Sequence, residues 1–500
     1  MKKFLFRAEA VNLTPTVYDT SDISTIRGGG FYLLNRVGML AQHTNWKQHL
    51  ITEGASSAVF AIETNDPNDI RQQLLKFLYN GSQPIKEMMF IVEYIEETNS
   101  FPEDMARLMG KVRYAQMQSP SIRIFPETLK AESGMDFDEL NRVLPAHQWD
   151  SGKEKNLSSF TYSRREQGKP LRQEIYKNVL GSNIDGYEFT NDLESLSKDS
   201  SQGNLDGKIA YIYIDGNKFG ALQRSFSKAE LGQYDNTLHT LKKLFLQAII
   251  NLVKDRPSFI NKQKEVRLET LLWGGDEIKL IVPAWLGWEV ASLFYQVVAK
   301  QNPLAPEHTP GGVINRELTY AMGLVFSHHK NPIRNIDTVA GMLVDAVKSG
   351  LKNDPGNKPE YYKCTGNRMH YMVLESLETM PSSYDLFAKE YYRTVCGDLV
   401  LTSSEMDELK TFAANLKSGI SRSWLHEIAR SWALGSQVKY TNNLQRALDI
   451  SPLSKKDKLG LSQEIQTITG TTIQDGIVQS SPPGKGYRWL QVAELWDYLL

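Results

Sequence analysis

The same order of predicted elements occurs twice along the chain. Each copy has the pattern of a strand, a helix, two strands, a second helix and a final strand, from apolar alternation and helical spacing. The segments are 2–13, 22–42, 49–52, 54–63, 65–80 and 88–97 in the first copy, and 208–220, 236–254, 266–273, 277–283, 284–301 and 318–329 in the second. If residues 49–52 form a short strand, this is the order of a ferredoxin-like split βαβ unit. The sequence therefore predicts an α+β fold that contains this unit twice.

The two copies differ at the tip of the hairpin between their middle strands. Aligned on that tip, Gly54-Ala-Ser-Ser of the first copy matches Gly274-Gly-Asp-Glu of the second, with the apolar alternation in phase. The second copy thus has acids where the first has serines. Glu9 is the only acid on the first strand of the first copy. We therefore expect the chemistry in the second copy and a structural role for the first.

Three acids of the second copy are expected to meet in space. Asp215 ends the apolar strand YIYI, and Asp276 and Glu277 occupy the hairpin tip. In the predicted sheet this strand and this hairpin are central neighbours. Clustered carboxylates repel one another unless a cation binds them, and hard oxygen ligands suit Mg²⁺ or Mn²⁺. The sequence therefore predicts Asp215, Asp276 and Glu277 as the catalytic ligands of a two-metal site.

Residues around these acids suit a bound nucleotide. Glycines would let a triphosphate approach the backbone closely, and lysines would supply positive charge for its phosphates. Asn217 could add a metal ligand or a ribose contact. We expect nucleotide contacts from Gly216, Asn217, Gly274, Gly275, Lys330, Lys348 and Lys352. Each motif alone is also typical of a turn, and each lysine alone of a solvated surface, so that only their combination favours a site.

Such a site would carry out nucleotidyl transfer. Two divalent ions about 4 Å apart can activate a ribose hydroxyl, steady the phosphorus under attack and neutralise departing pyrophosphate. The sequence therefore predicts an enzyme that consumes nucleoside triphosphates and releases pyrophosphate.

The composition of the chain indicates how many folding units it has, what it could bind and in which compartment it would work. A length of 500 residues predicts several folding units. With 57 basic and 58 acidic residues, any contact with nucleic acid would depend on local patches. The 2 cysteines cannot make a four-ligand zinc site on their own, and their scarcity fits a reducing compartment. No export signal or membrane span is visible, so we expect a cytoplasmic protein without membrane contact.

The rest of the chain divides into two parts. Residues 100–207 are rich in Ser, Lys, Asn and Gln, which predicts a linker or insert that is partly helical. Beyond residue 379 the pattern predicts a helical C-terminal domain. In the insert, basic residues surround Tyr162 and Tyr176; they are Arg164, Arg165, Lys169, Arg172 and Lys177. Two interpretations of this cluster are open, a nucleic-acid contact or an ordinary solvated helix.

These motifs resemble a known family. YIYIDGNKFG (211–220), LLWGGDEIKLIV (271–282), MGLVFSHHKNPI (322–333) and LVDAVKSGLKN (343–353) are similar to the catalytic palm of the large subunit of type III CRISPR effector complexes, a relative of GGDEF-type nucleotide cyclases. Segment 19–34 resembles that subunit's first, inactive palm, and segment 399–432 its C-terminal helical domain. The resemblance implies a degenerate palm at 1–99, an insert at 100–207, a catalytic palm at 208–378 and a helical domain at 379–500.

The resemblance also implies an activity and partners. The chain would be a nucleotidyltransferase that converts ATP, or another nucleoside triphosphate, into cyclic oligonucleotides or cyclic dinucleotides that alert antiviral effectors. Its implied partners are RNA and CRISPR-type effector subunits, and a homodimer is a further candidate assembly. The chain departs from the family because it has no His-Asp dipeptide of an HD nuclease, no cysteine in 100–207 for a zinc site, and Glu277 where a second Asp is commonest.

Two other hypotheses stay open. The chain could be an RNA-binding scaffold subunit whose palms bind nucleotide without turnover, or a sensor that binds a small nucleotide between the palms and never reacts. The intact acids of the second copy argue against the scaffold. Under the catalytic hypothesis the first palm is a structural mate that could hold an acceptor nucleotide, and Glu9→Ala should spare turnover.

Overall fold

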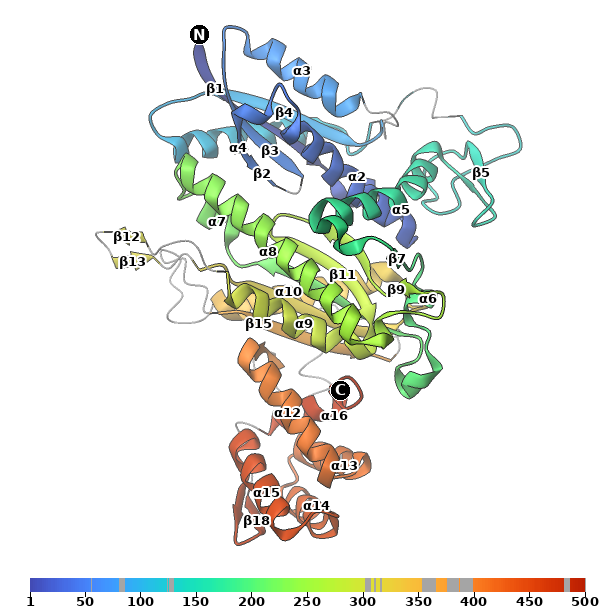
Figure 1. Ribbon diagram of the computed structural model, residues 1–500, viewed down its shortest axis with the longest axis vertical. Coiled ribbons are helices and arrows are strands. Elements are labelled where there is room, and N and C mark those ends of the chain that lie inside the picture. Colours follow the sequence, from blue (N-terminus) through green and yellow to red (C-terminus); the bar gives the residue numbers. More distant parts are fainter. Residues whose placement is uncertain are drawn as a thin grey trace.

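The chain folds into a mixture of helices and strands with several sheets and a helical C-terminal region, which confirms the predicted α+β class. The computed structural model describes residues 1–54, 56–80, 86–123, 125, 130–301, 307–309, 312–314, 317–352, 366–375, 386, 399–480 and 486–499. Figure 1 shows a unit with β1 to β4 at the top, a unit around β11 and β15 in the middle and the C-terminal helices at the bottom.

The first unit is a four-stranded antiparallel sheet in the order β2-β3-β1-β4. Its strands are β1 (Lys2–Val11), β2 (Leu50–Glu53), β3 (Ser57–Thr64) and β4 (Met89–Glu96). Its helices are α1 (Leu13–Val17), α2 (Ile23–Gln42), η1 (Lys47–His49), α3 (Pro67–Tyr79) and α4 (Phe101–Gln118). β2 is the short strand expected at 49–52. Helix α3 begins where expected, because Asp66 accepts hydrogen bonds from the N–H groups of Asn68 and Asp69 and Pro67 opens the helix.

The second unit repeats this order and extends it. Its sheet runs β10-β11-β8-β14-β15-β16. The strands are β8 (Lys208–Gly216), β10 (Glu269–Trp273), β11 (Glu277–Pro283), β14 (Tyr320–His328), β15 (Arg368–Leu374) and β16 (Leu401–Thr402). The helices are α7 (Phe219–Gln223), α8 (Lys228–Asp255), η5 (Pro257–Phe259), α9 (Ala284–Ala299) and α10 (Ile333–Lys352). A separate two-stranded sheet joins β12 (Glu307–Thr309) and β13 (Gly312–Ile314).

The two units share their hydrogen-bond register at the hairpin tip. Glu9 pairs with Ser57 in the first unit, and Asp215 pairs with Glu277 in the second. In each hairpin the N–H of the first glycine donates to the carbonyl oxygen three residues on, at 2.7 Å, from Gly54 and from Gly274. The alignment made from the sequence therefore holds for the described residues of the two tips.

Helices cover both faces of the second sheet. Helix α9 packs on the face that carries Ala210, because a Cβ built at Gly287 would lie 2.3 Å from the Ala210 Cβ. Helix α10 packs on the other face, where a Cβ at Gly323 would lie 2.5 Å from the Ala340 carbonyl oxygen. Gly323 pairs with Tyr213, two residues before Asp215. Since side chains alternate along a strand, Asp215 lies on the face that α10 covers.

The segment between the units packs on both of them. It contains β5 (Gln148–Asp150), β6 (Lys155–Leu157), α5 (Ser159–Leu180), η3 (Gly181–Ile184), β7 (Glu188–Phe189), α6 (Leu193–Ser197) and η4 (Ser200–Leu205), and β7 pairs with β9 (Glu265–Val266). Helix α5 lies beside α2 (Figure 1), and a Cβ at Gly28 would lie 1.6 Å from the Arg164 carbonyl oxygen. The two helices therefore approach so closely that only glycine fits at this position.

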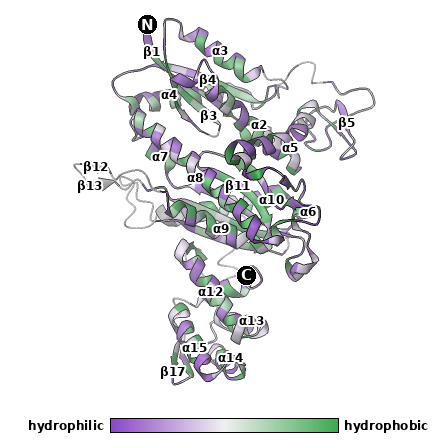
Figure 2. Cartoon of the chain, in the orientation of Figure 1, coloured by the Kyte–Doolittle hydropathy of each residue, from purple (hydrophilic) through white to green (hydrophobic). Residues whose placement is uncertain are grey.

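The C-terminal region is helical, as the sequence predicts. It comprises α12 (Ser403–Gly419), α13 (Arg422–Ala433), α14 (Gln437–Ile450), α15 (Lys455–Thr469), β17 (Thr472–Gln474), β18 (Ile477–Ser480) and α16 (Tyr487–Leu495). Figure 2 shows helices that carry both hydrophilic and hydrophobic residues along their length, as expected when one side of each is buried. Within the described ranges, every helix is too short or too polar to cross a bilayer.

Candidate active site

The structure brings the three predicted acids to one end of the second sheet. Asp215 ends β8, and its pairing partner on β11 is Glu277. The N–H of Gly216 donates to the carbonyl oxygen of Asp276 at 3.1 Å, which fixes the hairpin tip against β8. Residues far apart in the sequence are thus joined by the strand register that the repeat predicted. The meeting is a consequence of backbone pairing and needs no ligand.

Asp276 is the acid most affected by its surroundings. Burial, together with the negative charges of Asp215 and Glu277, raises the pKa of Asp276 from 3.8 to about 6, while Lys348 opposes this rise. A carboxyl group in such a position releases its proton more readily when a cation binds beside it. The cluster therefore favours a positive ligand.

Lys348 already provides one positive charge. Its Nζ lies 2.6 Å from Asp215 Oδ2 and donates to the Gly216 carbonyl oxygen at 3.1 Å. Both side chains are partly exposed, at 26% each. The lysine reaches this position because α10 crosses the sheet face on which Asp215 lies. The predicted nearness of Lys348 to the acids is thus seen in the structure.

Lys330, unlike Lys348, is not brought to this end of the sheet. Strand β14 runs antiparallel to β8, with Tyr320 opposite Gly216 and His328 opposite Lys208. Lys330 follows His328 and so lies roughly 25 Å along the strand from the acids. The expectation that Lys330 contacts a triphosphate at this site is therefore wrong, because it ignored the direction of β14. The side chain of Lys352 lies outside the described residues.

The predicted glycines and Asn217 shape the loops beside the acids. A Cβ at Gly216 would lie 2.5 Å from the ring of Phe219, so this glycine admits the ring rather than a ligand. Asn217 donates from Nδ2 to Thr319 Oγ1 at 3.2 Å, which ties the loop to the start of β14. Its Oδ1 is buried and has no hydrogen-bond partner among the described residues. Gly274 and Gly275 line the cavity described next.

A cavity of about 510 Å³ lies between the two units beside Asp276 and Glu277. A volume of this size is within the range of small-molecule sites. The first unit contributes Arg7, Tyr18, Leu33 and Met105, among others, and the second contributes Gln223, Arg224 and Tyr234 besides the hairpin. The cavity is therefore apolar on much of its wall, and its lining includes the carboxylates of the hairpin and an arginine from each unit.

Lys242 is a site residue that the sequence reasoning missed. Its Nζ donates to the Gly274 carbonyl oxygen at 2.7 Å, and the residue is only 7% exposed. Burial lowers the pKa of Lys242 to about 8, although Asp235, Glu53 and Asp276 oppose the change. The signal was present, since Lys242 follows Leu238 by four residues on the apolar side of a helix. Through its hydrogen bond to Gly274, Lys242 of α8 fixes the position of the hairpin tip.

Lys279 is a second missed residue. Its Nζ lies 2.8 Å from Asp337 Oδ1 and 3.8 Å from Glu277 Oε1. Tyr211 donates to the same Asp337 oxygen at 2.6 Å. A charged residue within the apolar strand EIKLIV was the signal for this network. Lys279 offsets the charge of Glu277 on the face that carries Asp215.

The first unit has a counterpart of this site without its chemistry. Glu9 occupies the register position of Asp215, and its two oxygens lie 2.6 Å from Arg7 Nε and 2.6 Å from Arg113 Nη2. Arg113 comes from α4, as Lys348 comes from α10. Ser56 and Ser57 stand where the second unit has Asp276 and Glu277. A single carboxylate held between two guanidinium groups offers little to a metal ion.

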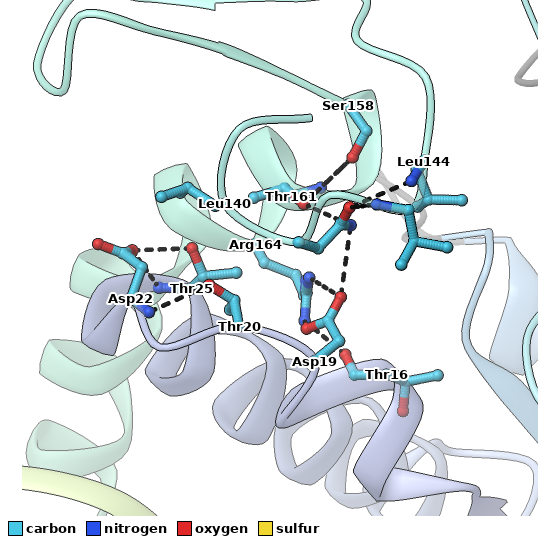
Figure 3. A network of polar contacts seen from close by, with 12 residues as sticks. Thr16, Asp19, Thr20, Asp22, Thr25, Leu140, Leu144, Ser158, Thr161 and Arg164 are labelled. Carbon is cyan, nitrogen blue, oxygen red and sulfur yellow. Dashed lines mark hydrogen bonds and ion pairs between the residues drawn. The ribbon is translucent and has the colours of Figure 1, made fainter. Parts of the chain in front are cut away.

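The basic cluster of α5 fits neither interpretation offered by the sequence. Arg164 is fully buried, and its guanidinium lies 2.8 Å from Asp19 Oδ1 (Figure 3). Arg165 contacts Asp22 and Asp150 at 2.6 and 2.8 Å. Arg172 contacts Glu269 at 3.0 Å and is also buried. Three of the five cations therefore hold the insert to both units and are not free for nucleic acid.

The three acids have the oxygen ligands that divalent cations prefer, but their side chains are not arranged as a metal site in this structure. All three acids are carboxylates, and burial together with the neighbouring negative charges raises the pKa of Asp276 to about 6. Among the described residues, no three or more His, Cys, Asp or Glu side chains converge as ready metal ligands. Lys348 occupies one of the Asp215 oxygens. Metal binding at Asp215, Asp276 and Glu277 stays a prediction.

Comparisons with known proteins give the fold. No protein-family model matches the sequence, and no curated relative matches it. Solved structures do match: Csm1 in T. onnurineus has a TM-score of 0.54 at 12% identity, over 99% of this chain and 69% of that one. A Csm1-Csm4 cassette in complex with one ATP has a TM-score of 0.53 at 13% identity, over 99% and 70% of the two chains. A cassette in complex with cA4 has a TM-score of 0.52 at 12% identity, over 99% and 70%. The chain therefore has the fold of Csm1, as its resemblance to the large subunit of type III CRISPR effector complexes predicts.

Proposed function

We propose that the chain is a metal-dependent nucleotidyltransferase that converts nucleoside triphosphates, ATP first among them, into cyclic oligonucleotide or cyclic dinucleotide messengers of antiviral defence. The observation that carries this proposal is the pairing of Asp215 with Glu277, which brings Asp215 to the hairpin tip whose Asp276 and Glu277 line a cavity between two palm-like units. The structural neighbours support it, because they were solved with one ATP, with AMPPNP and with cA4.

The three acids are the proposed ligands of divalent cations, Mg²⁺ or Mn²⁺. Bound there, such ions would supply charge for the activation of a ribose hydroxyl and for the departure of pyrophosphate. Burial and the negative charges of Asp215 and Glu277 raise the pKa of Asp276 to about 6, and a cation bound beside it would lower that pKa again.

The lysines of the site prepare it for a polyphosphate. Lys348 neutralises Asp215 in the free protein, and its ammonium can turn to a phosphate oxygen once another cation takes that carboxylate. Lys242 keeps the hairpin tip in place through the Gly274 carbonyl oxygen. Lys279 offsets the charge of Glu277 from the interior of the sheet. Together they reduce the repulsion that an empty cluster of three acids would produce.

A direct test measures turnover. The purified chain is incubated with each nucleoside triphosphate and Mg²⁺ or Mn²⁺, and products are identified by mass spectrometry. We expect cyclic products and pyrophosphate from the wild type and none from Asp276→Ala. Lys330→Ala is the matched control, because this lysine lies at the far end of β14, and it should react like the wild type. Equal turnover by Asp276→Ala would refute the assignment.

A non-catalytic nucleotide sensor is the second candidate. The observation that favours it is the Lys348–Asp215 ion pair, which occupies a proposed metal ligand in the free protein. A sensor would be stabilised against heat by a nucleotide without consuming it. Thermal shifts with ATP and Mn²⁺, measured beside the product assay, separate the two functions.

The proposed partners follow from the neighbours. The cassettes that share this fold contain Csm4 as well as Csm1, and we propose a subunit of that kind as a partner of this chain. Contact with RNA, homodimer formation, a cytoplasmic location and the domain limits at 99, 207 and 378 stay predictions.

A further inference from the structure

Tyr18 belongs to the first unit but lies at the acidic site of the second. It follows α1 as the residue that ends the helix, and it lines the cavity that also contains Asp276 and Glu277. Burial raises the pKa of Tyr18, and the negative charges of Asp337 and Glu277, both of the second unit, raise it further. The phenol therefore stays protonated and can act as a donor.

The backbone on both sides of Tyr18 is held in place. Arg164 of α5 donates from Nη1 to the Thr16 carbonyl oxygen at 2.7 Å and to Asp19 Oδ1 at 2.8 Å. Its Nη2 donates to Asp19 Oδ2 at 2.9 Å. Figure 3 shows the guanidinium between these two partners. Because Arg164 is fully buried, this clamp positions the segment that carries Tyr18 firmly against the insert.

The ring of Tyr18 has a structural partner. Lys279 Nζ lies 5.0 Å from the centre of the Tyr18 ring and 4.4 Å from that of Tyr213, so the ammonium sits between two aromatic faces. This contact accounts for an aromatic residue at position 18. A phenylalanine would supply it equally well.

The hydroxyl of Tyr18 has no such explanation. It is buried, and no hydrogen-bond partner is found for it within the described part of the chain. Leaving a buried hydroxyl without a partner is unfavourable, so a group of this kind needs a reason. A ligand in the adjoining cavity would supply the missing acceptor.

We propose that Tyr18 is a substrate-binding residue that the first unit contributes to the second, with its hydroxyl donating a hydrogen bond to an oxygen of a nucleotide bound beside Glu277. This inference rests on the proposed function for the identity of the ligand. It gives the first unit a direct part in the site, beyond that of a structural mate. The Arg164 clamp then couples the insert to substrate binding.

The test compares Tyr18→Phe with the wild type in nucleotide binding and in stability. Calorimetry with AMPPNP and Mn²⁺ should show affinity about three- to tenfold weaker in the variant, as expected for the loss of one hydrogen bond. Mn²⁺ binding without nucleotide should be unchanged. The thermal midpoint of the free variant should equal or exceed that of the wild type, because a hydroxyl without a partner is removed and the ring stays over Lys279.

Tyr114→Phe on α4 is the matched control, since that tyrosine is 63% exposed and away from the cavity lining; its binding should be that of the wild type. AMPPNP affinity unchanged in Tyr18→Phe overturns the inference, as does a lower midpoint of the free variant, which would reveal a structural partner. Binding by the wild type without any turnover would refute the proposed catalysis and leave the Tyr18 comparison decisive. Turnover by the wild type with equal binding by both proteins would refute only the role of Tyr18.

Discussion

Asp276 is destabilising for the fold in the absence of a cation. Its pKa of about 6 lies above the ordinary value of 3.8, so the folded state holds this proton more tightly than the unfolded state does. The folded state is therefore favoured at low pH, and this advantage is lost as pH rises from about 4 through 6. We expect Asp276→Asn to raise the free energy of unfolding by about 1–3 kcal/mol at pH 7. Urea denaturation at several pH values measures the difference.

The pH profile provides the control for this prediction. At about pH 3 or below, wild type and Asp276→Asn should have similar stability, because the wild-type carboxyl is then mostly neutral in both the folded and the unfolded state. At pH 7 the gain should shrink when Mn²⁺ is added, since only the wild type keeps the full set of carboxylates. If Asp276→Asn were less stable than the wild type at pH 7, the negative charge of Asp276 would already be compensated by its surroundings in the free protein.

Glu9 differs from Asp215 although both occupy the same register position. Its carboxylate lies between Arg7 and Arg113, so removing it leaves two guanidinium groups without their partner. We expect Glu9→Ala to lower the free energy of unfolding by about 1–3 kcal/mol, less than for breaking a fully buried ion pair, because Arg113 is half exposed. Metal-dependent turnover should persist. Product assays of folded Glu9→Ala and Asp215→Ala, run side by side, test whether only the second acid is needed for turnover. Loss of activity in both variants would contradict this prediction.

Some residues of the site could be predicted from sequence and others could not. Asp215, Asp276 and Glu277 were predictable because strand pairing alone brings them together. Lys330 was misplaced because its position depends on the direction of β14, which the local pattern does not reveal. Tyr18 had no local signal at all. Its role depends on contacts between units, and sequence spacing carries no information about these.

At the scale of elements, the close packing of α2 on α5 depends on glycine. A Cβ at Gly28 would overlap the Arg164 backbone at 1.6 Å, and backbone cannot yield as a flexible side chain would. We expect Gly28→Ala to destabilise the protein by about 1–3 kcal/mol despite the better helix propensity of alanine. Gly110→Ala on α4 is the control, because no atom lies within 4 Å of its Cβ. That variant should be more stable by about 0.5–1 kcal/mol, and thermal melts distinguish the two.

The elements themselves followed from the sequence to a large extent. Apolar alternation predicted the strands that the two units share but not β15 and β16 of the second sheet, and the shared order predicted the repeat that the register now shows. The sequence predicted helix in the region of α5, but it did not predict that α5 would be buried between the two units. Its arginines find partners such as Asp19, which lies 145 positions away in the sequence, so the local pattern looked like an exposed basic surface.

At the scale of the whole molecule, one carboxylate joins three parts of the chain. Glu269 of β10 accepts from Arg27 of α2 at 2.6 Å and from Arg172 of α5 at 3.0 Å, on the same oxygen. All three side chains are at most 2% exposed. The cluster therefore holds one more positive charge than negative in the interior. Since β10 leads directly into Gly274, it also ties the hairpin tip to the first unit and the insert.

The charges of this cluster predict which of two variants loses more of its free energy of unfolding. Glu269→Gln leaves two buried guanidinium groups without a carboxylate, and breaking a buried ion pair in this way costs about 3–5 kcal/mol. Arg172→Met keeps the Arg27–Glu269 pair, which is then balanced, and loses mainly hydrogen bonds to the Thr190 and Phe189 carbonyl oxygens. We expect about 1–3 kcal/mol for that loss. Denaturation followed by tryptophan fluorescence measures both.

AMPPNP affinity should fall in the same order as stability if Glu269 positions the hairpin, because Glu269 lies on the strand that ends at its tip. We expect Arg172→Met to lose less stability and affinity than Glu269→Gln, because the cluster has two arginines for one carboxylate. If Arg172→Met proved as damaging as Glu269→Gln, the insert would be held by the hydrogen bonds of Arg172 rather than by charge. The three parts would then be joined by backbone contacts around β7, and the carboxylate would be a consequence of their meeting instead of its cause.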